Sequence, residues 1–323
     1  MPIILSENDL APLLKTAARM DELLPLIEDA MRAQSSGAVG GQARVETSLL
    51  DDKKKFRIMT SAVPNAGQGM RINALFRGAK DAYFILLFDG ESGDLLGLVA
   101  GRDLNVWRTG APGGVACKYL APNGAEELGL IGSGRQARGQ IVAIRRAVPS
   151  LRKVKVFSST KEHRDAFAKE MTTWLGVEVE AVESARAAVE NMPIVSLATS
   201  SRSTVIEPRW IKPGALVVSI TSGQLPRETV AHSRVIVSWK EEVLGGDAPR
   251  QPYSSMIGDG SWSAEKIAGE LGDVILGRVS ARVNENETVV FESVGMPIWD
   301  TVTTAWAYRW AAEQGVGIKF SLE

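Results

Sequence analysis

The amino-acid sequence predicts an α/β fold in which a doubly wound parallel sheet follows a mostly β region. From Glu126 onward, short apolar runs alternate with segments that can form helices or crossovers, as in a parallel sheet. Before that point, apolar segments bounded by turn residues are typical of strands. Hydrophobic residues make up 45% and charged residues 23% of the 323 residues, which suggests two domains with a sizeable core.

The charge balance and the cysteine content argue against several classes of protein. A formal net charge of −1 gives no overall positive field for nucleic acid or an anionic membrane. The start MPIILSENDL turns acidic after its apolar residues, unlike a secretory signal, and no apolar run approaches a membrane span. A single cysteine, Cys117, excludes an internal disulfide framework. The two histidines, His163 and His232, lie far apart in the sequence, so no metal site is expected. We therefore expect a soluble cytoplasmic protein without metal.

The N-terminal part is expected to hold helices and then strands. Residues 7–33 place leucine and isoleucine side chains at helical spacing. The charge run LDDKKKFR (50–57) is interpreted as a solvated turn rather than a binding patch. Strands are predicted at RIMTSAVP (57–64), GMRINALF (69–76), AYFILLFD (82–89) and LLGLVAG (95–101), with ESGDLLG as a hairpin-like turn.

The remainder predicts helices around a run of buried strands. Residues 103–121 are interpreted as a helix whose beginning is a loop around Arg108, and residues 296–314 as a closing helix. The stretch from Trp239 to Trp262 is expected to be irregular. The five apolar runs of the parallel sheet are ELGLIG, KVKVFSS, MPIVSLATS, ALVVSIT and RVIVSW.

A glycine-rich turn follows the first of these runs. The stretch LGLIGSGRQARGQ (128–140) contains a G-x-G-x-x-A element that lies between an apolar strand and a helical segment. In such a turn the first glycine permits the bend, the second lets the backbone approach a pyrophosphate, and the small third residue lets helix and strand pack closely. The helix N-terminus then offers amide groups to phosphate. The sequence thus predicts a Rossmann dinucleotide-binding domain, with cofactor contacts from Gly132, Ser133, Gly134, Arg135, Gln136 and Ala137.

The end of the second strand of this domain indicates which dinucleotide is bound. NAD is usually held there by a carboxylate on the ribose 2′-hydroxyl, but here the strand runs into Ser158, Ser159 and Thr160, with Lys161 and Arg164 beyond. Hydroxyl and cationic groups suit a 2′-phosphate. NADP(H) is therefore favoured, with NAD(H) as the alternative if Lys161 and Arg164 are only solvated residues at a helix start.

Several motifs in a fixed order resemble one known family, the ornithine cyclodeaminase/mu-crystallin family. They are LLFDGESGDLLGLVAGRDLNVWRTGAPGGVACKYLAP (86–122), LGLIGSGRQAR (128–138), IVSLATSS (194–201), KPGALVVSI (212–220), GELGDVILGRVSAR (269–282) and FESVGMPIWD (291–300). The resemblance covers nearly the whole chain. It implies a substrate-binding and dimerisation domain of residues 1–121 plus 297–323, an α+β partner to a Rossmann domain of residues 122–296, and a homodimer.

The resemblance also implies particular site residues. The substrate carboxylate is expected to be held by Arg44 in GGQARVE and Arg108 in VWRTG, because guanidinium groups can bond a carboxylate through two hydrogen bonds. Thr199 and Gly295 lie in matching motifs and join the expected cofactor contacts. Asp300 in GMPIWD is either a catalytic helper near the nicotinamide or a structural residue at a helix N-terminus.

Two departures from the family pattern bear on the chemistry. Arg71 in GMRINALF stands where the family has an active-site lysine, and arginine does not release a proton. Gln224 in TSGQLP stands where the cyclodeaminases have an aspartate, and glutamine can bond an amine but cannot act as a base. Asp247 in GGDAP follows a different strand, so that role is not transferred to it. Arg71 keeps a predicted substrate and catalytic role, and Gln224 a predicted substrate contact.

These departures favour one activity over two alternatives. We expect NAD(P)H-dependent reduction of the imine or ketimine of a small 2-oxo acid, or the reverse dehydrogenation of an amino acid. Ammonia elimination of the ornithine cyclodeaminase type and a non-catalytic NADP-binding protein are the alternatives. Among the tryptophans, Trp299, Trp306 and Trp310 are expected in the core or at a dimer contact, while Trp107 either lines the substrate pocket or packs.

Overall fold

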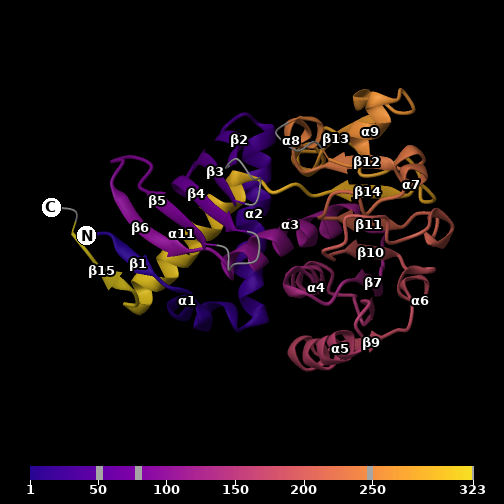
Figure 1. The fold of residues 1–323 in the computed structure, drawn as a ribbon, viewed down its shortest axis with the longest axis horizontal. Helices are drawn as coiled ribbons and strands as arrows, with labels where there is room; N and C mark the ends of the chain where they lie inside the picture. Colours follow the sequence, from indigo (N-terminus) through magenta and orange to yellow (C-terminus); the bar gives the residue numbers. More distant parts are fainter. Residues whose placement is uncertain (49–53, 77–81, 246–249, 322–323) are drawn as a thin grey trace. The chain divides into compact units, whose positions relative to one another are not determined.

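The computed structural model describes residues 1–48, 54–76, 82–245 and 250–321. Asp247 and the first residues of the charge run at 50–57 lie outside these ranges. The chain divides into a first unit, Met1–Arg108 with Gly295–Glu323, and a second unit, Thr109–Val294 (Figure 1). One division falls inside a helix, α3 (Leu104–Leu120), rather than at its end, where the sequence places the domain boundary.

The first unit is built on a largely antiparallel sheet. Its strand order is β15-β1-β6-β5-β4-β3-β2, and β1 and β6 are the parallel pair. Helix α11 crosses this sheet and packs against β3 and β4 (Figure 1). The strands are β1 (Ile3–Leu5), β2 (Gly40–Ser48), β3 (Lys54–Val63), β4 (Gly67–Phe76), β5 (Ala82–Phe88), β6 (Leu95–Ala100) and β15 (Ile318–Lys319), and the α-helices are α1 (Glu7–Leu14), α2 (Met20–Ser35) and α11 (Pro297–Gln314).

The close approach of α11 to the sheet depends on one small residue. A Cβ atom at Gly69 on β4 would lie 2.1 Å from Oγ1 of Thr301 on α11, so any larger residue would push the helix away. Thr301 also shares a hydrogen bond of 2.7 Å with Ser61 on β3. These contacts fix the first turn of α11, which carries Asp300, against the middle of the sheet.

Most predictions for this unit are confirmed. The predicted strands correspond to β3, β4, β5 and β6, the helical region 7–33 forms α1 and α2, and the closing helix is α11. The strands β1, β2 and β15 were not predicted. β2 runs through GGQARVETS at the sheet edge with half-buried or exposed side chains, so it carries no apolar run.

The second unit contains a fully parallel sheet. Its order is β13-β12-β14-β11-β10-β7-β8-β9, and every neighbouring pair is parallel. Every residue of β10, β11 and β14 is buried, as expected for central strands covered on both faces. The strands are β7 (Glu127–Ile131), β8 (Lys153–Phe157), β9 (Glu178–Ala181), β10 (Ile194–Leu197), β11 (Leu216–Ser219), β12 (Arg234–Val237), β13 (Ile267–Glu270) and β14 (Val289–Glu292).

The helices of this unit connect consecutive strands. Helices α4 and α5 pack against each other and against β7 and β8, respectively (Figure 1). The strand order makes β7 the point at which the chain reverses direction across the sheet, which is where doubly wound folds bind their ligands. The helices beyond α3 are α4 (Arg135–Ala147), α5 (Lys161–Leu175), α6 (Ala185–Val189), α7 (Arg227–Ala231), α8 (Lys240–Leu244), α9 (Tyr253–Gly258) and α10 (Leu271–Ile275).

The five predicted parallel strands are confirmed as β7, β8, β10, β11 and β12, but two local predictions are wrong. Arg108 is not in a loop, because α3 begins at Leu104 and continues through it. The glycines of α3 serve packing: a Cβ atom at Gly110 would lie 2.2 Å from the carbonyl oxygen of Gly139 on α4. The stretch expected to be irregular after Trp239 contains α8 and α9, whose short length leaves little periodicity to detect.

Candidate active site

The turn between β7 and α4 has the geometry of a phosphate-binding loop. Gly132 has φ +116°, and a Cβ atom there would lie 2.3 Å from the carbonyl oxygen of Ala198, so only glycine fits. A Cβ atom at Gly134 would meet nothing within 4 Å, which shows open space beside the second glycine. Ala137 is fully buried, as required of the small third residue.

The start of α4 completes this loop. Gly134 is the N-cap residue and has no side chain to accept hydrogen bonds from the amide groups of the first turn. These amide groups, the helix dipole and the open space at Gly134 fit a pyrophosphate group. Arg135 is exposed and Gln136 is half-buried, while the hydroxyls of Ser133 and Ser158 lie 2.8 Å apart and join the turn to the end of β8.

At the end of β8, Arg164 is already engaged by the protein. Its side chain is 4% exposed, Nη1 donates to the carbonyl oxygen of Ser158 at 3.1 Å, and Nη2 pairs with the Glu183 carboxylate. Ser159 and Thr160 are exposed, and Lys161 pairs with Asp165 at 2.6 Å. Arg164 therefore holds the loop after β8, and the Glu183 carboxylate neutralises the charge of its guanidinium group. In this structure Arg164 does not present an unpaired cation to a 2′-phosphate.

Gln224 is fully buried within the second unit. Its Nε2 atom donates to the carbonyl oxygen of Thr199 at 2.7 Å and to that of Ser201 at 2.9 Å. Both amide protons are thus used to hold the loop that follows β10, and Thr199 is half-buried in that loop. The substrate contact predicted for Gln224 stays a prediction. The observed hydrogen bonds to backbone carbonyl groups require a donor, which an amide provides and a carboxylate does not.

In the first unit, three elements bring two arginines and a tyrosine together around Asp300 of α11. Arg71 on β4 reaches Oδ2 of Asp300 through Nη1 at 3.2 Å, and Arg108 on α3 reaches Oδ1 through Nε at 3.0 Å. Tyr83 on β5 donates its hydroxyl proton to Oδ1 at 2.9 Å. Asp300 is 3% exposed, Arg108 6% and Arg71 8%, so these charges are paired within a buried cluster.

The strand register explains how Arg71 and Tyr83 meet. Tyr83 on β5 lies opposite Asn73 on β4, and Arg71 precedes Asn73 by two residues, so the side chains share one face. The Nε atom of Arg71 donates to Oδ1 of Asn73 at 2.7 Å, and its guanidinium carbon lies 4.4 Å from the centre of the Tyr83 ring. The Arg71 side chain is therefore fixed from two sides.

Gly295 marks where Arg44 and Arg108 converge. A Cβ atom at Gly295 would lie 3.1 Å from Nη1 of Arg108 and 3.8 Å from Nη2 of Arg44. Both guanidinium groups therefore face the same glycine, and a larger residue there would crowd them. We name Arg44, Arg71, Arg108, Tyr83 and Asp300 the arginine cluster. It contains three guanidinium groups and one carboxylate, an excess of positive charge suited to a carboxylate ligand.

The protonation states in the cluster follow from burial and neighbouring charge. Burial raises the pKa of Tyr83 to about 12, and the Asp300 carboxylate adds to this while Arg71 and Arg108 oppose it. For Arg108, burial lowers the pKa, but the Asp300 carboxylate and Tyr83 together more than offset this, so the net pKa is raised. Tyr83 therefore keeps its proton and Arg108 its charge at physiological pH.

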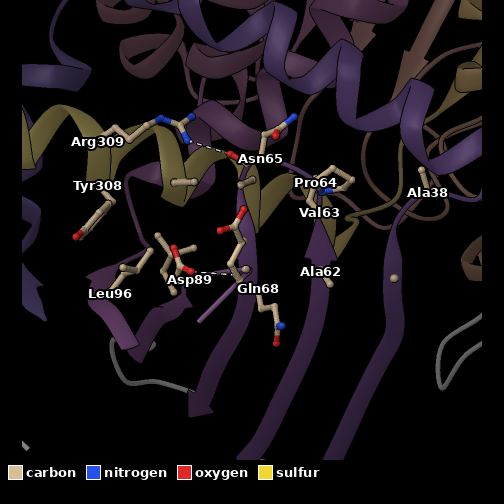
Figure 2. A pocket seen from close by; sticks show the side chains of 17 residues that line it. Ala38, Ala62, Val63, Pro64, Asn65, Gln68, Asp89, Leu96, Tyr308 and Arg309 are labelled. Carbon is tan, nitrogen blue, oxygen red and sulfur yellow. Dashed lines mark hydrogen bonds between the residues drawn. The ribbon is translucent and has the colours of Figure 1, made fainter. Parts of the chain in front are cut away.

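A separate hollow of about 620 Å³ lies in the same unit between the β3–β4 turn, the β5–β6 turn and the later part of α11 (Figure 2). Asp89 and Glu91 line it together with Arg309, whose Nη1 atom donates to the carbonyl oxygen of Asn65 at 3.4 Å. None of its lining residues belongs to the arginine cluster. With carboxylates in excess, this hollow does not suit a carboxylate substrate.

The remaining predictions concern aromatic, metal and membrane features. Trp107 is 5% exposed and packs on Trp306 with ring centres 6.0 Å apart, so it belongs to the core rather than to an open pocket wall. Trp299 is also buried, while Trp310 is half-buried. Within the described ranges, no group of three or more His, Cys, Asp or Glu side chains could hold a metal ion. No helix among the described residues is both long and apolar enough to cross a bilayer.

Two functional candidates were missed from the sequence. Tyr83 lies in a strand motif with no polar signature, and only the β4–β5 register brings it to Arg71. Glu183 follows β9, a strand that was itself not predicted, so its pairing with Arg164 had no signal in the sequence.

Comparison with known proteins identifies a family and a shared fold. The model of the ornithine cyclodeaminase/mu-crystallin family matches residues 9–315. A Delta(1)-pyrroline-2-carboxylate reductase from Bacillus cereus is 33% identical over 241 residues, 73% of each chain. The structure of Thermococcus litoralis Delta(1)-pyrroline-2-carboxylate reductase in complex with NADH and L-proline is 30% identical, with a TM-score of 0.89 over 98% of this chain and 100% of that one. An archaeal alanine dehydrogenase dimer with bound NAD, 23% identical, shares the fold with a TM-score of 0.89 over 100% and 99% of the two chains.

Proposed function

The chain belongs to the ornithine cyclodeaminase/mu-crystallin family, and we infer that it is an NAD(P)-dependent oxidoreductase acting on CH–NH or CH–NH2 groups. It reduces the imine or ketimine of a small 2-oxo acid, or runs the reverse dehydrogenation. The observation that carries this proposal is the arginine cluster, in which the buried Arg71 and Arg108 and the half-buried Arg44 surround one buried carboxylate, in a chain that also has a dinucleotide-binding turn.

Different residues of the arginine cluster bind the substrate and position the binding groups. Arg44 and Arg108 bind its carboxylate from the side of Gly295. Asp300 holds Arg71 and Arg108 in place, so its role is to position the two guanidinium groups. Gly132, Gly134 and the start of α4 hold the dinucleotide, whose reduced nicotinamide supplies a hydride when bound. Fixing the carboxylate orients the C=N bond, which lowers the entropic part of the barrier.

Ammonia elimination of the cyclodeaminase type is not favoured. That reaction needs groups that take and return protons at the substrate amine. Arg71 stays charged, and both amide protons of Gln224 are occupied by backbone carbonyl groups. Reduction of a preformed imine needs fewer proton transfers than ammonia elimination does. It is also the type of reaction named for the similar reductases.

We propose a cyclic imino acid with one carboxylate, of the Delta(1)-pyrroline-2-carboxylate type, as the substrate class. Both similar reductases carry this compound in their names, and the structure of the second is a complex with NADH and L-proline. A single carboxylate satisfies Arg44 and Arg108, since Arg71 is held by Asp300 and Asn73. A substrate with a second carboxylate would have to compete with Asp300 for Arg71.

For the cofactor, we propose that both NADPH and NADH are accepted, with NADPH preferred. No carboxylate stands at Ser158, Ser159 or Thr160 to bind a 2′-hydroxyl and repel a 2′-phosphate. The preference is modest because Glu183 neutralises Arg164, the nearby buried cation.

We also propose that the protein forms a homodimer in the cytoplasm. The exposed apolar side chains of Val45 on β2 and Phe56 on β3 support the dimer, and the similar archaeal alanine dehydrogenase is described as a dimer. Light scattering during gel filtration would test this, and a monomer at micromolar concentration would contradict it.

The activity is tested by following NADPH and NADH oxidation with a panel of substrates. The panel contains Delta(1)-pyrroline-2-carboxylate, its six-membered homologue, and 2-oxo acids with ammonia or methylamine. We expect the fastest turnover with the cyclic imines, and reverse oxidation of L-proline at high pH. An Arg108→Met variant should bind the dinucleotide normally but lose turnover. Tight dinucleotide binding without turnover of any imine would contradict the proposed reaction and favour a binding protein.

A further inference from the structure

Reduction of a C=N bond requires a proton at nitrogen as well as a hydride at carbon. Arg71 keeps its proton, and Asp300 accepts hydrogen bonds from Arg71 and Tyr83 and forms an ion pair with Arg108. Neither is suited to donate. We propose that Tyr83 is the catalytic proton donor, and this inference rests on the proposed imine reduction.

The position of Tyr83 suits this role. It is half-buried, so part of its side chain remains accessible. Its ring lies against the Arg71 guanidinium, 4.4 Å from ring centre to Cζ, and its hydroxyl lies 2.9 Å from the carboxylate that holds Arg108. The phenol thus adjoins the residues that orient the substrate.

The hydroxyl group has the freedom that a donor needs. Among the described residues, it donates to Oδ1 of Asp300 at 2.9 Å and to Oδ1 of Asn105 at 3.3 Å. A phenol has one proton, which rotates about the C–O bond and can turn from these acceptors to a substrate nitrogen. Burial keeps the group protonated, since it raises the pKa of Tyr83 to about 12.

The proposed step balances atoms and electrons. The imine carbon accepts a hydride from the reduced dinucleotide, the C=N π electron pair moves to nitrogen, and nitrogen takes the Tyr83 proton. The products are the amine, the oxidised dinucleotide and a Tyr83 phenolate. The phenolate and the Asp300 carboxylate then face Arg71 and Arg108, so negative and positive charges balance until a solvent proton restores the phenol.

Substrate protonation provides the test. At low pH the imine arrives as an iminium ion and needs no proton donor, whereas at high pH it arrives neutral and depends on one. The Tyr83→Phe variant should therefore lose little activity at low pH and about 10²- to 10⁴-fold in kcat at high pH. The groups facing Tyr83, namely Arg71 on β4, Arg108 on α3 and Asp300 on α11, are unchanged in this variant, so KM and NADPH affinity should change little.

A matched control is Tyr308→Phe, the same chemical change on α11 outside the arginine cluster, which should keep wild-type kcat at every pH. A second probe replaces Tyr83 with a fluorinated tyrosine, whose more acidic phenol should move the high-pH fall in kcat to lower pH. This probe tests the role even if Tyr83→Phe does not fold.

A loss of kcat in Tyr83→Phe that is independent of pH, or no loss of kcat, would overturn the inference. If the wild type reduces no imine, the proposed function itself fails; if it does and both Tyr83 probes behave as the wild type, only the donor assignment fails.

Discussion

At the scale of single residues, Arg108 contacts Asp300 with one part of its guanidinium group and lies beside Gly295 with another. Its Nε atom contacts Asp300 at 3.0 Å, while its Nη1 atom lies close to Gly295 and faces the same glycine as Arg44. A planar guanidinium group can hold a fixed carboxylate on one edge and present another edge to a ligand. A lysine ammonium is a point charge and cannot do both in this geometry.

We therefore predict that Arg108→Lys raises KM for the imino acid by about 10- to 100-fold, because a charge-assisted hydrogen bond contributes roughly 1.5–3 kcal/mol. Steady-state kinetics at saturating NADPH measure this. Arg309→Lys, at an exposed arginine of the same unit, is the control and should leave KM unchanged. An unchanged KM in Arg108→Lys would remove Arg108 from the substrate site.

Cofactor preference should respond to Glu183. Replacing it in Glu183→Gln removes the negative partner of Arg164, so the cation becomes available to attract a 2′-phosphate. The ratio of NADPH to NADH affinity should rise about 3- to 10-fold, in line with the ~1 kcal/mol of a partly exposed charge interaction. Titration calorimetry with each dinucleotide measures this, and Glu190→Gln, at an exposed pair with Arg186, is the control. Equal changes for NADPH and NADH would contradict the assignment.

At the scale of elements, the β7–α4 turn depends on two glycines for different reasons. At Gly132 the backbone has φ +116° and lies against the carbonyl group of Ala198, so the constraint is internal to the fold. At Gly134 the backbone faces open space, so no neighbour among the described residues requires glycine there, and we propose that the constraint comes from the bound dinucleotide.

The variants Gly132→Ala and Gly134→Ala should distinguish a requirement of the fold from a requirement of dinucleotide binding. Gly132→Ala should lower the free energy of unfolding by at least about 1–3 kcal/mol, because its backbone conformation is strained for other residues and its Cβ meets a carbonyl oxygen. Gly134→Ala should unfold at the wild-type temperature but bind NADPH more weakly. Thermal unfolding and titration calorimetry measure the two effects. Similar stability losses in both variants would contradict the distinction.

At the scale of the whole molecule, global stability is linked to a carboxyl group at the end of β14. Glu292 is fully buried, and its Oε1 atom lies 2.8 Å from Nε of Arg250. Burial raises the pKa of Glu292 from 4.5 to about 7, despite the opposing effect of Arg250. The unfolded chain releases this proton at a lower pH than the folded protein does. The contribution of neutral Glu292 to the free energy of unfolding is therefore fully present below about pH 4.5, and it declines as the pH rises to about 7.

The Glu292→Gln variant should be insensitive to this titration. Its free energy of unfolding relative to the wild type should rise between pH 5 and 7 and stay level above, with a total change on the order of 3 kcal/mol. Urea unfolding at several pH values measures the difference, with Glu190→Gln, at a half-buried carboxylate paired with Arg186, as the control. A difference that does not vary with pH would show that Glu292 titrates normally.

Much of this organisation was already present in the sequence. Apolar runs long enough to be buried on both faces mark β7, β10, β11 and β12, because such strands need no alternation with polar residues, whereas β8 (KVKVF) is marked by alternation of buried valines with half-buried side chains. The G-x-G-x-x-A element marks the dinucleotide turn, because its backbone geometry requires small residues at fixed spacing. Edge and short strands such as β2, β9 and β15 gave no pattern, since little of their surface is buried apolar side chain.

Local sequence therefore determined the fold class and the G-x-G-x-x-A turn, while the resemblance to a known family pointed to the candidate arginines Arg44, Arg71 and Arg108. Only the tertiary structure decided what those side chains contact: that Asp300 holds Arg71 and Arg108, that Tyr83 lies against Arg71, and that Glu183 engages Arg164. The physical reason is that backbone conformation and burial follow from neighbours along the chain. Hydrogen bonds and ion pairs between distant residues follow from strand register and helix packing, which no local pattern contains.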